Sequence, residues 1–505
     1  MKLLVKNTLR LNLAALFLSC YFIPANQLYA LEAEMEHKAI GINLLGIKDW
    51  SSELVFNDYF KRARPWINNK PSTSLELDRH GWVKKLSPEQ TAQTYILTNF
   101  QGHFPSKIFT CTYEGEGLIS FPEAVILKQQ SGRLFIRLKD HAQNLSLVIR
   151  KTNPTNYIHN IRIYSGNTVQ AATFRPDFLE RWKPFSTIRF MDWMQTNNST
   201  QKNWRDRARP DDFSQATKKG VALEYMIELV NTLNISPWFC MPHQASDDYV
   251  RNFAKLVRDT LKPNLNIYIE YSNEVWNQSF QQHQYAQREG ERLNLSKHEY
   301  LRPIRYYSQR SVDIFHIWQS IFHGHKRLVR ILSGQAVVPY MTTQILTWKD
   351  AWKHADAYAI GDYFGGGINK ALLHATKQNQ QTLLHLLQQD LKEKKQLIQQ
   401  QHNITSAKHL QLFAYEGGQH LVTRNNPKLN LLFDSINRSP QMKTLYSQHL
   451  KNWFASNGAL FMHFGSVSRN SKYGRWGALE WYDQNLQHTK YAALQNAQKT
   501  LFSAP

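Results

Sequence analysis

Short runs of β-branched and aromatic residues recur between residues 187 and 465, and each is followed by a turn and a longer amphipathic segment. The seven runs cover residues 187–192, 236–242, 266–273, 328–334, 357–364, 411–418 and 459–465. The segment between the first two, "VALEYMIELVNTLN", has apolar residues at helical spacing and is long enough to cross over a parallel sheet. This alternation predicts a parallel sheet covered by helices.

An eighth run, "AIGINLLGI" at 39–47, lies far upstream. Eight parallel strands are the number that closes a (β/α)8 TIM barrel, so we expect an α/β fold of this type. The interval from residue 47 to residue 187 is too long for one crossover and contains short strand-like runs separated by Gly, Asn and Asp turns. We therefore expect a barrel over 31–70 and 165–505, with a β-sandwich-like insert at 71–164 between strands one and two.

The first thirty residues have the pattern of a signal peptide. Lys2, Lys6 and Arg10 precede an apolar run that is too short to span a bilayer, and cleavage is expected after Ala30. An alternative is lipidation at Cys20, although "LFLSC" matches the lipidation pattern less well. No later run has about 20 uninterrupted apolar residues. We expect an exported protein, periplasmic or extracellular, without a transmembrane span in the mature chain.

The chain is strongly basic, with a formal net charge of +22 at pH 7. Such a charge favours contact with anionic polymers or envelope surfaces, but Lys and Arg are scattered, so a generally basic solvated surface explains it equally well. Only Cys111 and Cys240 follow the predicted leader, which excludes a disulfide scaffold.

The stretch "NIYIEYSNEVWN" at 266–277 begins as a buried strand and ends in polar residues. Active sites of such barrels lie at the carboxyl ends of the strands, where Asn273 and Glu274 end the fourth strand and Glu416 ends the seventh. These two strands stand on roughly opposite sides of the barrel mouth, so the carboxylates should face each other. Paired carboxylates acting on one sugar ring are what glycoside hydrolysis requires.

This arrangement resembles clan A of the retaining glycoside hydrolases, whose (β/α)8 barrels carry an Asn-Glu pair after strand four and a Glu after strand seven. The motifs "YSNEVWN" and "YEGG", with "GINL…W" at 41–50 and "RFMDWM" at 189–194, are also similar to bacterial secreted proteins described as cellulose-binding or cellulase-like. The resemblance implies a secreted retaining hydrolase of β-linked polysaccharide or oligosaccharide that needs no cofactor and no metal.

The resemblance also implies roles for individual residues. Glu274 would be the general acid/base, Glu416 the nucleophile, and Asn273 a ligand of the sugar 2-hydroxyl. Arg189 matches a strand-two arginine that lowers the pKa of the nucleophile. Tyr363 matches a tyrosine that hydrogen-bonds the nucleophile.

Three further residues are candidates for the walls of the same site. His243, which follows the third strand, would line it, and either Trp476 or Trp481 would form a floor for sugar stacking. Asp362 beside Tyr363 departs from the family pattern and leaves the register open by one position. In a retaining enzyme the two carboxyl groups should be about 5 to 5.5 Å apart.

Other readings of these residues remain open. A strand-end Glu beside an Arg is often only a buried ion pair. The barrel is also compatible with a non-catalytic carbohydrate-binding surface protein, or with an enzyme that uses the two glutamates for proton abstraction.

The chain contains no HExxH, CxxC, GxSxG or GxxxxGK[ST] motif, so zinc, serine-nucleophile and P-loop chemistries lack their minimum residues. We expect a monomer whose partner is a glycan, possibly anionic or derived from the cell envelope, and not a nucleic acid.

Overall fold

The computed structural model describes residues 38–375, 377–487 and 489–503, and these residues belong to one compact unit. The predicted signal peptide and Cys20 lie outside the described residues. Among the helices that are described, none is both long enough and apolar enough to cross a membrane.

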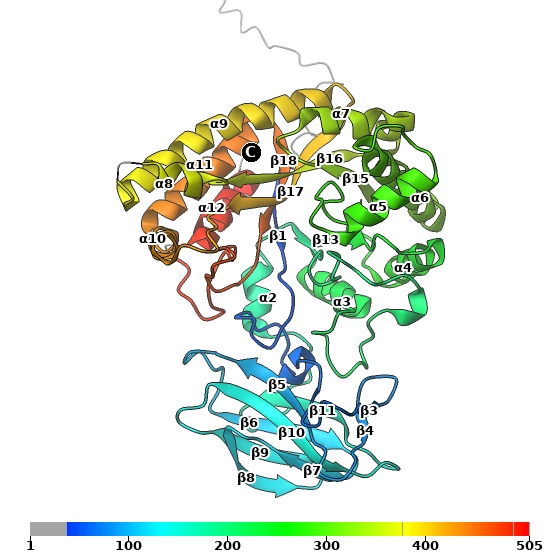
Figure 1. The fold of residues 1–505 in the computed structure, drawn as a ribbon, viewed down its shortest axis with the longest axis vertical. Helices are drawn as coiled ribbons and strands as arrows, with labels where there is room; N and C mark the ends of the chain where they lie inside the picture. Colours follow the sequence, from blue (N-terminus) through cyan, green and yellow to red (C-terminus); the bar gives the residue numbers. More distant parts are fainter. Residues whose placement is uncertain (1–37, 376, 488, 504–505) are drawn as a thin grey trace, which may run out of the picture. The chain divides into compact units, whose positions relative to one another are not determined.

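Eight parallel strands form a closed barrel in the order β1-β12-β13-β14-β15-β16-β17-β18, with β18 pairing back onto β1 (Figure 1). The strands are β1 (Ile40–Asn43), β12 (Thr187–Arg189), β13 (Ser236–Met241), β14 (Ile267–Tyr271), β15 (Leu328–Gly334), β16 (Ala357–Phe364), β17 (Gln411–Gln419) and β18 (Gly458–Phe464). Each falls within or beside one of the eight predicted runs. The predicted (β/α)8 fold class is confirmed.

Helices follow the barrel strands, as the amphipathic segments predict. They are α2 (Pro176–Trp182), α3 (Leu223–Leu233), α4 (Asp247–Thr260), α5 (Gln281–Arg292), α6 (Leu301–Phe322), α7 (Pro339–Thr347), α8 (Ile368–Leu373), α9 (Gln380–Ser406), α10 (Pro427–Asn437), α11 (Pro440–Ala455) and α12 (Lys490–Ser503). Ser246 begins α4 by accepting a bond from the Tyr249 amide at 3.1 Å, and Asn379 caps α9 in the same way at 2.9 Å. Short 3-10 turns occur at Tyr59–Arg62, Trp204–Asp206 and Trp348–His354.

The barrel strands are buried on both faces, which explains their nearly continuous apolar sequences. One core lies inside the barrel and includes Trp238, Tyr268 and Phe413. A larger core lies between the strands and the helices and includes Ile267 and Ile269. The alternation along β14 therefore turns the residue after Ile269, Glu270, toward the barrel interior.

The antiparallel strands between β1 and β12 surround a hydrophobic core of their own, and this region is here called the double-sheet part (blue to cyan in Figure 1). Its four-stranded sheets have the orders β2-β5-β10-β7 and β11-β6-β9-β8, and β3 pairs with β4. The strands are β2 (Ile67–Asn68), β3 (Glu76–Leu77), β4 (Val83–Lys85), β5 (Ala92–Thr98), β6 (Ile108–Glu114), β7 (Gly117–Ser120), β8 (Ala124–Gln130), β9 (Arg133–Leu138), β10 (Asn144–Thr152) and β11 (His159–Ser165).

The core of the double-sheet part extends beyond its own strands. It reaches back to Leu54, Tyr59 and Phe60, and Trp481 and Tyr482 from the loop after β18 pack against it. Loops of the barrel are therefore joined to the double-sheet part by shared apolar contacts.

Candidate active site

Arg189, the last residue of β12, is fully buried inside the barrel and binds two carboxylates. Its Nε and Nη2 donate to Oε2 of Glu270 at 3.1 and 2.8 Å, and its Nη1 donates to Oε1 of Glu416 at 3.1 Å. The remaining acceptors are amide oxygens of Asn43 at 3.1 Å and Asn273 at 2.9 Å. One guanidinium thus fixes four side chains from the ends of three other strands, β1, β14 and β17.

A β-bulge directs Glu416 into the barrel. The register between β16 and β17 passes from Ile360 opposite Ala414 to Gly361 opposite Glu416, so Tyr415 has no partner of its own. As a result both Tyr415 and Glu416 make contacts inside the barrel mouth. The second oxygen of Glu416 accepts a bond from the Tyr363 hydroxyl at 2.8 Å.

Glu274 follows β14 in a constrained backbone conformation. Its φ is +43° and that of Ser272 is +62°, values that side chains other than glycine seldom adopt. This turn aims the carboxyl of Glu274 at the bulged strand, where Oε1 accepts a bond from the Tyr415 hydroxyl at 3.1 Å. Oε2 accepts a bond from the Asn277 amide at 3.0 Å.

The two glutamates titrate as a pair. Burial raises the pKa of Glu274, and burial with repulsion from Glu274 raises the pKa of Glu416 to about 8, although Arg189 acts in the opposite direction. Two interacting buried carboxyls do not both ionise near neutral pH, and the raised values belong to the pair. Because the cation donates to Glu416 whereas Glu274 has only neutral donors, we assign the single charge to Glu416 and the proton to Glu274.

The sequence-based expectation for Arg189 is incomplete, because it overlooked Glu270. This glutamate is fully buried below the arginine and also accepts bonds from the Trp238 indole at 3.0 Å and the Ser333 hydroxyl at 2.9 Å. Two of the five hydrogen bonds that Arg189 donates go to this second carboxylate, and the lowering of the Glu416 pKa by Arg189 does not outweigh burial. The sequence did contain a signal for this residue, because Glu270 is the one acidic residue in the otherwise uncharged strand "IYIEY".

Asn273 and His243 have different surroundings. Asn273 is buried, and its amide nitrogen donates to Asn197 at 3.0 Å while its oxygen binds Arg189. His243 is buried after β13, where its ring lies 5.4 Å from that of Tyr285 and 3.2 Å from the Gln244 amide. Burial lowers the pKa of His243 to about 4. None of its described contacts is with either glutamate.

The two candidate tryptophans lie in different environments. Trp476 is half-buried, and its ring centroid lies 5.7 Å from that of Tyr363, the residue that binds Glu416. Trp481 stacks on His103 at 4.0 Å and packs edge-on against Phe100, both in the double-sheet part. Trp476 is therefore the one beside the nucleophile candidate. The tyrosine, and not the neighbouring Asp362, contacts Glu416, which resolves the register at this position.

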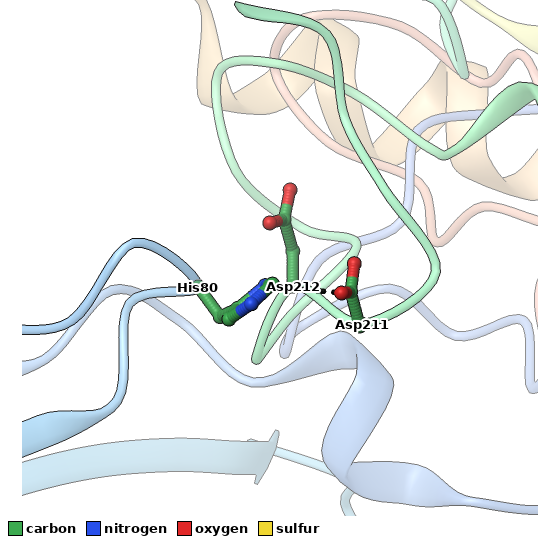
Figure 2. A group of neighbouring side chains, drawn as sticks. All are labelled: His80, Asp211 and Asp212. Atoms are coloured by element: carbon green, nitrogen blue, oxygen red, sulfur yellow. Dashed lines mark ion pairs between the residues drawn. The ribbon is translucent and has the colours of Figure 1, made fainter.

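His80, Asp211 and Asp212 form a group whose potential ligand atoms lie within 4.8 Å of one another (Figure 2). The His80 Nδ1 lies 3.3 Å from Asp211, whereas its Nε2 accepts a bond from Arg79 at 2.8 Å. A neutral imidazole has one acceptor nitrogen, and here Arg79 uses it. Nδ1 then carries the hydrogen and faces a carboxylate, so this arrangement favours a direct polar contact between His80 and Asp211 over a metal site.

No protein-family model matches the chain, and no curated protein is similar to it in sequence. Three solved glycoside hydrolases illustrate its structural neighbours. A GH51 arabinofuranosidase from Xanthomonas axonopodis pv. citri is 12% identical, with 65% of this chain and 67% of that chain covered and a TM-score of 0.44. A family 51 alpha-L-arabinofuranosidase from Bifidobacterium longum is 10% identical, with 66% and 69% covered and a TM-score of 0.45. A GH5-4 endoglucanase from Clostridium cellulovorans is 11% identical, with 67% and 88% covered and a TM-score of 0.35. The resemblance to secreted cellulase-like proteins stays a prediction.

Proposed function

We propose that this protein is a retaining glycoside hydrolase that cleaves β-linked polysaccharide or oligosaccharide with Glu274 and Glu416. One observation carries the proposal: two glutamates from the ends of different barrel strands interact in a buried site and are held by directional donors. Such a pair has one charged and one protonated carboxyl near neutral pH, which is the state that acid-assisted glycoside cleavage requires.

In the first step, an oxygen of the Glu416 carboxylate attacks the anomeric carbon while the bond to the leaving oxygen breaks. Glu274 gives its proton to that leaving oxygen, so the aglycone departs as a neutral alcohol. The product is a glycosyl ester on Glu416 and an ionised Glu274. Removal of the charge from Glu416 relieves the repulsion between the two groups and so favours loss of the proton from Glu274.

In the second step, the Glu274 carboxylate takes a proton from water, and the water oxygen attacks the anomeric carbon. The ester bond breaks, and Glu416 is released as a carboxylate. Two displacements at one carbon retain the configuration. Arg189 and Tyr363 hold Glu416 in position, and burial raises the pKa of Tyr363, which keeps its hydroxyl a donor.

The test is turnover on a panel of β-linked polysaccharides and aryl glycosides, with Glu274→Ala and Glu416→Ala beside the unmodified protein. We expect both variants to lose activity. Azide should restore turnover of an activated aryl glycoside, giving a β-glycosyl azide with Glu274→Ala and an α-glycosyl azide with Glu416→Ala. A matched control is Glu291→Ala, a 65% exposed side chain on α5.

A second candidate function is glycan binding without turnover. It requires the opposite proton assignment, with the proton of the pair on Glu416, whose pKa is raised by burial, because a buried carboxyl that keeps its proton is a poor nucleophile. In that case the unmodified protein would turn over no member of the panel, and glycan binding would survive both substitutions. We also propose that the protein is exported, on the pattern of residues 1–30.

A further inference from the structure

A cavity of about 770 Å³ is formed jointly by barrel loops and the double-sheet part. Its walls include Lys48 and Trp50 from the segment after β1, Asp192 after β12, Arg469 and Trp481 after β18, and Asn99 after β5. The volume is within the range of about 300 to 1,000 Å³ that is typical of small-molecule sites.

Asp192 connects the cavity to the candidate active site. It lies three residues after Arg189, it lines the cavity, and its charge contributes to raising the pKa of Glu416. The glutamates themselves do not line the cavity. A chain-like substrate bound at the glutamates is thus adjacent to the cavity, which would hold sugars beyond those at the cleaved bond.

Two cations in the cavity wall have no carboxylate partner among the described residues. Arg438 is paired with Glu480 at 2.8 Å, but the Lys48 ammonium donates to the Ala216 carbonyl at 3.2 Å. The Arg469 guanidinium donates to the carbonyls of Asn99 at 3.0 Å and Trp50 at 3.1 Å. Carbonyl groups orient both cations and neither forms an ion pair in the described part of the chain, although Asp192 and Asp49 attract the Lys48 ammonium from a greater distance. Both cations are therefore able to bind an anion.

Aromatic faces lie beside these cations. Trp50 is 50% exposed in the cavity wall. The Arg469 guanidinium lies 5.4 Å from the ring centroid of Trp481, which is itself stacked on His103 of the double-sheet part. An exposed indole beside a fixed cation suits a ligand with both an apolar ring face and a carboxylate.

We propose that this cavity binds an acidic sugar residue of the substrate, a uronate, and that Lys48 and Arg469 bind its carboxylate. The double-sheet part then completes the substrate site, because Asn99 both lines the cavity and accepts a bond from Arg469. This inference rests on the proposed function, since it names a substrate class for the same site.

The test uses β-1,4-linked mannuronate and glucuronate oligosaccharides, and the same oligosaccharides after chemical reduction of their carboxyl groups. Calorimetric binding is measured on the full chain carrying Glu274→Gln, so that turnover does not interfere. We expect at least one acidic oligosaccharide to bind about tenfold more tightly than its reduced form, the difference expected for a charge-assisted hydrogen bond. This preference should weaken as salt increases.

Substitutions assign the preference to the cavity. In the same Glu274→Gln background, Lys48→Gln and Arg469→Gln should each weaken acidic binding about tenfold and change reduced-form binding less than twofold. Arg469→Lys keeps the charge and should retain part of the preference. Arg205→Gln, at a side chain that is 84% exposed, should change neither. Unfolding midpoints of all variants identify any loss that comes from the Arg469 contact with Asn99.

The outcomes separate the two proposals. Equal or tighter binding of every reduced oligosaccharide overturns the uronate site, and so does an acidic preference that survives both Gln substitutions. Turnover of neutral β-glycosides by the unmodified protein would then leave the proposed hydrolase intact. Acidic binding that depends on Lys48 and Arg469, without turnover of any substrate, would instead support the site and contradict the hydrolase.

Discussion

The floor of the barrel site, around Glu270, and its mouth, around Glu274 and Glu416, share the Arg189 cation. They differ in how completely their carboxyl groups are paired. At the floor, Glu270 receives donors from Arg189, Trp238 and Ser333, so a buried anion is fully paired. At the mouth, Glu416 accepts one bond from the same guanidinium and one from the Tyr363 hydroxyl, whereas Glu274 accepts bonds only from neutral donors, one of them the Tyr415 hydroxyl. Arg189 and Glu270 therefore form a stable ion pair at the floor, whereas Glu274 and Glu416 form a carboxyl pair that retains a proton at the mouth.

The backbone is also regular at the floor and irregular at the mouth. Glu270 lies in the regular part of β14, whereas Ser272 and Glu274 have positive φ angles and Glu416 follows a bulge. Strained or irregular backbone persists where surrounding structure holds it, and it is concentrated at functional sites. This comparison supports the proposal that the floor stabilises the fold and that the mouth carries the chemistry.

The largest expected effect is on activity at the mouth. Glu416→Gln should lower kcat by at least about 1,000-fold, because an amide neither attacks the anomeric carbon nor forms the ester intermediate. The variant should still unfold cooperatively, since Arg189 keeps its bonds to Glu270. Steady-state kinetics on the best aryl glycoside and thermal unfolding check the two parts. Loss of folding together with activity would make Glu416 a structural residue.

At the floor we expect a loss of stability instead. Glu270→Gln should lower the free energy of unfolding by about 3 to 5 kcal/mol, because it removes one partner of a buried ion pair and leaves Arg189 with an incompletely paired charge. Urea denaturation measures the change. The exposed Glu291→Gln should stay within about 0.5 kcal/mol of the unmodified protein. A stable Glu270→Gln variant would show that the floor is not what fixes the arginine.

The pH dependence of stability distinguishes the layers further. The interacting pair of Glu274 and Glu416 keeps one proton up to a pKa of about 8, above the ordinary value of 4.5, so the folded state binds more protons between these values. Its contribution to stability is therefore lost as pH rises from about 4.5 to 8. Glu416→Gln removes this loss and should be more stable than the unmodified protein by about 1 to 3 kcal/mol at pH 8, and by less at pH 5. Equal differences at both pH values in urea titrations would contradict a proton held by the pair.

The sequence predicts the barrel well because its strands alternate with helices at a spacing that local physics determines. All eight barrel strands lie within or beside predicted runs, since strands buried on both faces are continuous in apolar residues. The contacts of Glu416 with Arg189 and Tyr363 are also those that the family resemblance implies.

The parts that sequence could not supply depend on tertiary geometry. The bulge breaks the two-residue period of the strand, so a pattern argument that places Phe413 and Tyr415 inside the barrel assigns Glu416 to the wrong face. The competition of Glu270 for Arg189 needs the positions of three strands. The cavity beside Trp481 needs the double-sheet part and the loop after β18, which are far apart in sequence.

The smallest expected effect concerns the two tyrosines of the mouth. Tyr415→Phe removes a hydrogen bond that lowers the pKa of Glu274, so the basic limb of kcat/KM, where the acid loses its proton, should move to higher pH. Tyr363→Phe removes a bond that lowers the pKa of Glu416, so the acidic limb should move upward instead. We expect shifts of about 0.5 to 1 pH unit, since one hydrogen bond is worth about 1 kcal/mol. Because the two carboxyls interact, each variant should also move the other limb slightly, and a shift of both limbs by the same amount in both variants would mean that the proton has no preferred site in the pair.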